Sequence, residues 1–252
     1  MTKNIKEIIL DMVYPRTCPF CGRIPKEKGA VCKQCKMGLP YIQGARCMKC
    51  SKPIMDMEDE YCYDCKSKNH SYVSGKALWI YDDTMRASIS RYKYQGRLEY
   101  ADVYSEEIAK YYGEWIKLHG DVLIPVPLYK KKRRVRGFNQ AETLAERLGQ
   151  KLQIPVGSNW LCRRKDTLPQ KELSDVERKK NLTEAFEVSK ESFLMVKKVI
   201  LVDDIYTTGS TIEACARVLY DAGVKEVYFI SLCIGKGFYE NNCRKISRKK
   251  IK

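Results

Sequence analysis

The stretch with the clearest chemical content joins two adjacent carboxylates to a hydroxyl-rich turn. Asp203 and Asp204 follow the apolar residues 199–202, and the turn comes soon after them: Thr207, Thr208, Gly209, Ser210 and Thr211. Backbone N–H groups and hydroxyls in such a turn can surround a phosphate, and a helix that begins there directs its positive end at the anion. Two acids cannot help to bind that same phosphate. A sugar diol, with or without a divalent metal, would account for both halves of the segment.

A second set of chemically capable residues lies near the N-terminus, where eight cysteines form four Cys-x-x-Cys pairs. The pairs are Cys18 and Cys21, Cys32 and Cys35, Cys47 and Cys50, and Cys62 and Cys65, separated by 10, 11 and 11 residues. Two such turns close a tetrahedral zinc site with no open position. A disulfide framework would require an oxidising compartment, and a redox role would suit one pair but not four. We therefore predict two structural Zn²⁺ ions, bound by consecutive pairs or, alternatively, by interleaved ones.

The charge of the chain favours polyanionic partners. The formal net charge is +16, and it would still be about +12 with two zinc ions bound by eight thiolates. Much of the excess is concentrated in the clusters 130–136, 163–165, 178–180 and 243–252. Any one cluster can be a solvated basic loop, but four of them favour nucleic acid or a phosphorylated ligand.

Between these features the sequence predicts strands that alternate with helices. We expect strands at 75–81, 121–127, 197–204 and 226–234, and helices at 84–96, 99–118, 138–152 and 210–223. The strand at 197–204 lacks polar alternation, as is typical when both faces of a sheet are covered. This order predicts an α/β fold with a parallel sheet. Ligands of such sheets bind beyond the carboxyl ends of the strands, where Asp203 and Asp204 would lie.

The chain divides into four predicted segments. These are an amphipathic helix at 1–16, a double zinc ribbon at 17–70, the α/β domain at 71–240 and a basic tail at 241–252. Lys6, Glu7 and Asp11 interrupt the N-terminal apolar segment, which a secretory signal would not tolerate. No apolar stretch approaches the roughly 18 residues that span a bilayer. We therefore expect a cytoplasmic protein with no membrane span.

Two resemblances extend this interpretation. The stretch ILVDDIYTTGST (200–211) resembles the phosphoribosyl-pyrophosphate (PRPP) motif of type I phosphoribosyltransferases. Residues 124–145, with RGFNQAE as their most distinctive part, residues 165–186 and the cysteine-rich front end are together similar to the ComF/GntX family. The resemblance implies a zinc-binding N-terminal region and a type I phosphoribosyltransferase-like domain. It also implies that the acids bind the ribose 2′ and 3′ hydroxyls of Mg²⁺–PRPP while the turn binds the 5′-phosphate. Members of the competence branch are linked to uptake of single-stranded DNA beside the helicase ComFA.

A phosphoribosyltransferase must also neutralise the pyrophosphate that leaves C1 of the ribose. Cations from another loop would do this. Arg136, directly before Gly137, is the first candidate, and Lys131 and Arg134 are weaker ones because part of this run must face water. With Asp203 and Asp204, Arg136 completes the predicted catalytic set.

Further contacts to pyrophosphate or to an acceptor are predicted from two places. Arg178 and Lys179 belong to the segment 165–181, where such enzymes carry a mobile loop over the substrate. Gly137 is a further candidate. Asn139 and Gln140 open a helix, where their amides would either contact an acceptor or cap the helix. The sequence does not mark the acceptor.

The alternative function is non-catalytic. In that hypothesis the chain is a nucleic-acid-binding or PRPP-sensing module that docks a DNA-uptake helicase. The basic clusters would supply the electrostatic attraction, and Tyr92, Tyr94, Phe138 or the ribbons would supply stacking surfaces, unless those aromatics serve ordinary packing.

Overall fold

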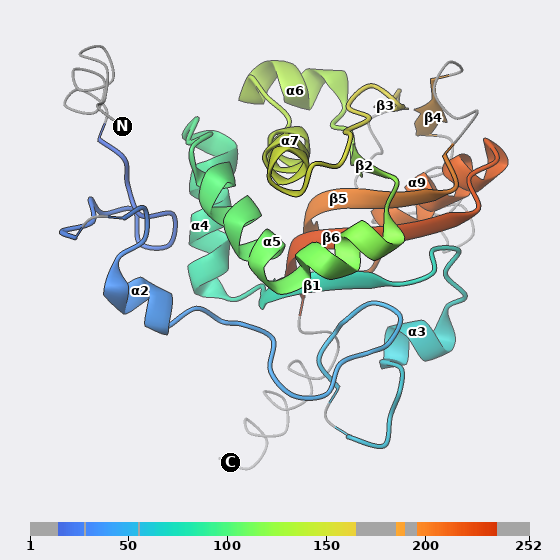
Figure 1. Cartoon of the computed structure of the whole chain (residues 1–252), viewed down its shortest axis with the longest axis horizontal. Coiled ribbons are helices and arrows are strands. Elements are labelled where there is room, and N and C mark those ends of the chain that lie inside the picture. Colours follow the sequence, from blue (N-terminus) through green and yellow to red (C-terminus); the bar gives the residue numbers. More distant parts are fainter. Residues whose placement is uncertain (1–14, 28, 55, 165–184, 190–195, 236–252) are drawn as a thin grey trace, which may run out of the picture.

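The computed structural model describes residues 15–27, 29–54, 56–164, 185–189 and 196–235 (Figure 1). The amphipathic helix expected near the N-terminus, the segment 165–181 with Arg178 and Lys179, and the basic tail lie outside the described residues. In the part that is described, no helix is both long and apolar enough to cross a membrane.

A four-stranded parallel sheet forms the centre of the molecule, as predicted. Its strands are β1 (Gly75–Ile80), β2 (Val122–Pro125), β5 (Lys198–Tyr206) and β6 (Glu226–Ile234), in the order β1-β6-β5-β2. β5 is an inner strand, paired with β2 on one side and β6 on the other. It continues for two residues beyond the predicted end at Asp204. The two acids therefore lie within the last four residues of the strand rather than at its end. All carboxyl ends meet at one edge of the sheet.

Helices cover both faces of this sheet (Figure 1). α4 (Asp83–Tyr94), α5 (Tyr100–His119) and α7 (Gln140–Leu152) pack on one face, and α9 (Ser210–Asp221) packs on the other. Alternate residues of β5 serve the two layers: Ile200 faces the three-helix side, and Leu201 faces α9. Burial on both faces explains why the strand is continuously apolar.

The helix boundaries follow from local sequence. The Asp82 side chain accepts a hydrogen bond from the Met85 backbone N–H and begins α4. Asn139 accepts one from the Ala141 backbone N–H in the same way and begins α7. Gly96 and Gly223 have the positive φ angles, 62° and 97°, expected where the chain leaves α4 and α9.

Two parts of the fold differ from the sequence prediction. The basic run at 130–136, expected as a loop, is a helix, α6 (Lys130–Arg136), which ends where Gly137 adopts φ 84°. Lysine and arginine are good helix formers, and Glu142 pairs with Arg133 to offset part of the like-charge repulsion. Two short strands, β3 (Leu161–Arg163) and β4 (Phe186–Val188), form a separate antiparallel pair that was not predicted.

The two cysteine-rich units pack on opposite faces of the sheet. In the first, which contains α2 (Lys33–Met37), Cys18 and Phe20 join the core beside α4 and α5. In the second, which contains α3 (Tyr63–Ser67), Cys47 and Cys50 join the core on the α9 side. The cysteine-rich region is thus built into the core of the α/β domain.

Short segments pair with both outer strands of the sheet. Between the two cysteine-rich units, residues 40–42 run beside β1, with an antiparallel bridge between Tyr41 and Trp79 and a 2.8 Å bond from the Ile80 N–H to the Pro40 carbonyl. At the other edge, Val156 forms a parallel bridge with Leu123 of β2.

Candidate ligand pocket and zinc sites

The eight predicted metal ligands form two four-cysteine groups. Cys18, Cys21, Cys32 and Cys35 make one group, and Cys47, Cys50, Cys62 and Cys65 make the other; within each, the ligand atoms lie within 4.8 Å of one another. Four sulfurs bound to zinc at ~2.3 Å are about 3.8 Å apart. The Sγ–Sγ distances of 3.4 Å for Cys21–Cys32 and 3.6 Å for Cys50–Cys62 fit that geometry. The consecutive pairing is therefore confirmed over the interleaved one, and both groups suit structural Zn²⁺.

A cavity of about 510 Å³ lies at the carboxyl ends of β2 and β5. It is bounded by the last turn of α4, by α6 and by the first turn of α7. Four kinds of side chain line it: the acid pair, a set of cations, a few neutral polar residues and a few apolar residues. The polar and charged lining residues are Lys93, Tyr94, Lys131, Lys132, Arg136, Gln140, Arg163, Asp203, Asp204 and Thr211. This is the position expected for a ligand of a parallel sheet.

The acid pair is held in place by its own strand and by neighbours. Asp204 is 4% exposed, and its backbone N–H donates a 2.8 Å hydrogen bond to Oδ1 of Asp203. Burial and the adjacent Asp204 carboxylate raise the pKa of Asp203 well above its usual range. A cation bound between the two carboxylates would relieve that repulsion.

A chain of polar contacts connects the acids to the basic helix. Lys93 forms an ion pair with Oδ2 of Asp204, and Nε2 of Gln140 donates a 3.1 Å hydrogen bond to Oδ1 of the same carboxylate. Arg136 donates to Oε1 of Gln140, and its guanidinium lies 5.1 Å from the ring centre of Tyr94. The structure thus brings Asp203, Asp204, Arg136 and Gln140 to one cavity.

Sequence reasoning missed Lys93. It lies on α4, next to Tyr92 on the buried face of an amphipathic helix, and a lysine in such a pattern is ordinarily a solvent-facing residue. Only the tertiary packing of α4 against α7 directs its ammonium at a carboxylate 111 positions away in the chain. Lys132 and Arg163 also line the cavity without having been singled out.

Asn139 and Gly137, which flank Phe138, have structural positions. Asn139 is buried; it caps α7 and donates a 3.1 Å hydrogen bond to the Val126 carbonyl, so the end of β2 is tied to the start of the helix. Gly137 ends α6 in the left-handed region, as described above. Neither residue is among those that line the cavity.

The hydroxyl-rich turn, residues 207–211, will be called the phosphate loop. Thr207, Thr208 and Ser210 are exposed, and the hydroxyls of Thr208 and Ser210 lie 2.9 Å apart. Gly209 has φ 78° and is the N-cap of α9, and Thr211 lines the cavity. A Cβ at Gly209 would lie 2.4 Å from the Tyr206 hydroxyl, so only glycine fits at this position. The loop presents the open N-terminus of a three-turn helix beside the acid pair.

Comparison with known proteins agrees with this architecture. The sequence matches the double zinc ribbon domain over residues 9–66 and the phosphoribosyl transferase domain over residues 135–252. The fold and the site therefore define a phosphoribosyltransferase-like protein with a double zinc ribbon.

The chain is 31% identical to competence protein F of Haemophilus influenzae, over 78% of this chain and 93% of that one. It is 32% identical to competence protein ComFC of Streptococcus pneumoniae, over 85% and 98%. DNA utilization protein YhgH of Escherichia coli is 27% identical, over 86% and 89%. The chain belongs to the ComF family of competence proteins.

Proposed function

We propose that this chain binds Mg²⁺–PRPP and acts as a phosphoribosyltransferase whose acceptor is unknown, in the handling of incoming single-stranded DNA. The observation that carries the proposal is the placement of the acid pair near the end of β5, with the phosphate loop directly after that strand, beside a cavity lined by cations. We expect PRPP to bind with its 5′-phosphate on residues 207–211 at the N-terminus of α9. The ribose 2′ and 3′ hydroxyls lie on Asp203 and Asp204.

The residues around the acids suit a magnesium-bound substrate. Mg²⁺ prefers oxygen ligands and commonly binds through one or two carboxylates together with substrate phosphates, and it would supply charge neutralisation for the pyrophosphate. Asp203 and Asp204 offer the carboxylates, and the Lys93 ammonium neutralises the charge of Asp204 through its ion pair. When the ligand enters, we expect the Lys93 ammonium to exchange Asp204 for a ligand oxygen.

We expect the cations of the cavity to assist departure of pyrophosphate from C1. Arg136, Lys131 and Lys132 come from α6, and Arg163 comes from the end of β3. Fixed positive charge near the leaving oxygens stabilises the transition state more than the ground state. Gln140, anchored between Arg136 and Asp204, keeps the cation and the acid in a fixed relation.

A titration with and without single-stranded DNA tests this function. Isothermal calorimetry of the full chain should show Mg²⁺-dependent binding of PRPP, and the release of pyrophosphate with a panel of bases should identify turnover. Binding without release for any acceptor would favour the sensing module over the enzyme. Absence of Mg²⁺-dependent PRPP binding would overturn the proposal.

The relatives named for competence and DNA utilisation favour the DNA-related part of the proposal. A cytoplasmic location and docking to a ComFA-like helicase belong to it as well. α6 adds a physical reason, because Lys130, Lys131, Lys132, Arg133 and Arg134 are exposed along it, and Tyr94, 71% exposed, lies at its Arg136 end. An exposed aromatic among cations is the usual arrangement for single-stranded nucleic acid. By contrast, Tyr92 is fully buried and serves packing.

Replacing Lys130 and Arg134 with glutamine tests the DNA contact, because both residues are exposed and neither lines the cavity. Loss of two phosphate contacts should reduce the slope of log affinity against log salt by about 1.4 for a single strand. Fluorescence anisotropy with labelled oligonucleotides measures this slope. The matched control is the double replacement Lys197→Gln with Lys225→Gln, two exposed residues directly before the amino-terminal ends of β5 and β6. Equal slopes for the two variants would remove α6 from the DNA surface.

A further inference from the structure

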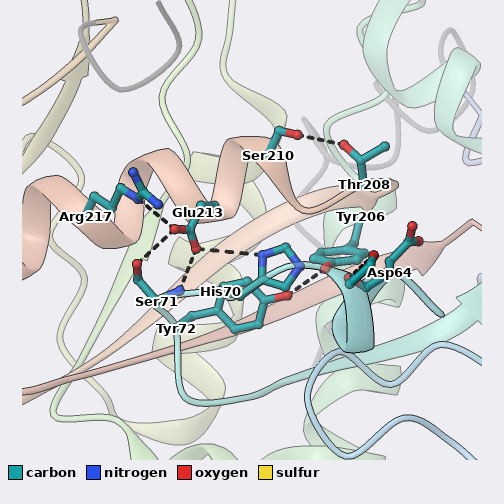
Figure 2. Close-up of polar contacts among 10 residues, drawn as sticks. Asp64, His70, Ser71, Tyr72, Tyr206, Thr208, Ser210, Glu213 and Arg217 are labelled. Atoms are coloured by element: carbon teal, nitrogen blue, oxygen red, sulfur yellow. Dashed lines mark hydrogen bonds and ion pairs between the residues drawn. The ribbon is translucent and has the colours of Figure 1, made fainter. Parts of the chain in front are cut away.

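The segment that directly follows the second zinc ribbon contacts residues on both sides of the phosphate loop (Figure 2). Its cysteines are Cys47, Cys50, Cys62 and Cys65. The three residues 70–72, which follow it, reach Tyr206 on one side of the loop and Glu213 on the other. The contacts are thus made before and after residues 207–211, so residues 70–72 border the phosphate loop without being part of it.

The first contact is a pair of buried tyrosines. The hydroxyls of Tyr72 and Tyr206 lie 2.6 Å apart, and the Tyr206 ring stacks on Phe229 of β6 with centres 4.7 Å apart. The Tyr206 hydroxyl lies directly beneath Gly209, where a Cβ would come within 2.4 Å of it. The Tyr206 hydroxyl and the backbone of the phosphate loop are therefore close neighbours, and we expect a change in the position of one to affect the other.

The second contact is centred on the Glu213 carboxylate in the first turn of α9. Ser71 donates to it twice, from its backbone N–H at 2.7 Å and from its hydroxyl at 2.8 Å. His70 lies 3.7 Å away through Nδ1, and Arg217 donates at 2.7 Å from the next turn of the helix. Burial raises the pKa of Glu213, but these contacts lower it to about 2, so the residue is an anion at neutral pH.

The second zinc ribbon also contacts Tyr72 and Tyr206 directly. The Lys49 ammonium, between Cys47 and Cys50, lies 5.6 Å from the ring centre of Tyr72. Lys52, 4% exposed, forms an ion pair with Asp64, which lies between Cys62 and Cys65. The Lys52 ammonium also lies 5.8 Å from the ring centre of Tyr206. The second ribbon has little apolar core apart from the cysteines that it shares with the core of the α/β domain, so we expect it to need its metal to hold these positions.

The first ribbon makes no comparable contact among the described residues. Thr17, next to Cys18, shares a 2.7 Å hydrogen bond with the Tyr100 hydroxyl of α5. Arg91 of α4 donates to the Phe20 carbonyl at 2.7 Å. These contacts lie on the other face of the sheet, away from α9.

We propose that zinc at the second ribbon and phosphate at residues 207–211 are thermodynamically coupled, with Tyr72, Tyr206 and Glu213 as positioning residues that carry the coupling. Zinc holds the loop in its binding geometry, and a bound phosphate group strengthens zinc retention by the same factor, because coupling between two sites is reciprocal. This inference rests on the proposed function, since it assigns the 5′-phosphate to the loop.

Calorimetric titration with ribose 5-phosphate and Mg²⁺ tests the forward direction. Tyr72→Phe and Glu213→Gln should each weaken binding by about 5-fold or more, a typical size for coupling between sites. Tyr100→Phe is the matched control, because it removes a tyrosine hydroxyl contact of the first ribbon, and it should bind like the unmodified chain. Thermal unfolding of each variant establishes that it is folded.

Zinc competition with a chromogenic chelator tests the reverse direction in the full chain. Saturating ribose 5-phosphate should protect one of the two zinc ions, and Tyr72→Phe should abolish the protection. Two results would overturn the coupling alone. One is normal binding by the unmodified chain together with unchanged affinity in both variants; the other is equal zinc release with and without the ligand. If the unmodified chain bound neither ribose 5-phosphate nor PRPP, the proposed function would fail and the coupling with it.

Discussion

Replacing Asp204 with asparagine is expected to weaken Mg²⁺-dependent PRPP binding by roughly 10- to 150-fold, the equivalent of about 1.5–3 kcal/mol for a lost charged contact. The amide keeps the shape of the side chain but removes its negative charge. Asp204 is buried and paired with Lys93, so the substitution also leaves the Lys93 ammonium without its counterion at the base of the cavity. Calorimetry at fixed Mg²⁺ concentration measures the change.

The control for this variant is Asp221→Asn, which removes an exposed carboxylate at the far end of α9. It should leave binding unchanged. Asp203→Asn adds a test of protonation, because the pKa of Asp203 is raised in the folded chain. Affinity in the unmodified chain should fall as the pH falls through that raised pKa, since a protonated carboxyl no longer attracts Mg²⁺, and this component should disappear in the variant. Full affinity in a chain that carries both Asp203→Asn and Asp204→Asn would contradict the assignment of the acids.

Replacing Cys50 with serine should have the largest effect on stability. Cys50 is fully buried in the second four-cysteine group, so its loss opens that site and should reduce the zinc content from two ions per chain to one. Zinc binding contributes on the order of 10–16 kcal/mol to the folding of small zinc modules, which is comparable to the whole stability of an ordinary domain. The ribbon should therefore unfold, and the α9 face of the core that it covers should become exposed.

Metal analysis by mass spectrometry and thermal unfolding by circular dichroism measure these effects. Cys162→Ser is the control, because Cys162 is exposed and belongs to neither group. It should keep both ions and the melting temperature of the unmodified chain. A Cys50→Ser chain that retained two zinc ions would contradict the ligand assignment.

The features predicted correctly from sequence depend on short-range patterns. The spacing of the Cys-x-x-Cys turns is local, and so is the order of strand, acid pair, phosphate loop and helix at 198–221. The continuous apolar character of β5 and β6 reports burial on both faces, which is enough to predict a parallel sheet.

The features that were missed depend on contacts between distant segments. Lys93 and Asp204 are joined only after α4 packs beside the sheet, and no spacing in the sequence marks the pair. Ser71 and Glu213, which form a hydrogen bond, are 142 positions apart in the sequence, and His70 lies beside them. Placement of the two ribbons on opposite faces is likewise a tertiary result, since both have the same cysteine spacing within their pairs.

The segment that joins the two ribbons has a consequence for solubility. A sheet with free outer strands offers unpaired N–H and C=O groups to other chains and is prone to aggregate. Residues 40–42 occupy that side of β1 through Tyr41 and Trp79, and residues 155–157 do the same for β2 through the 3.0 Å bond from the Leu123 N–H to the Pro155 carbonyl. Residues 40–42 lie in the sequence between the two zinc sites, so loss of the metals would be expected to free them from β1. Zinc binding would therefore also protect the sheet from β pairing with other molecules.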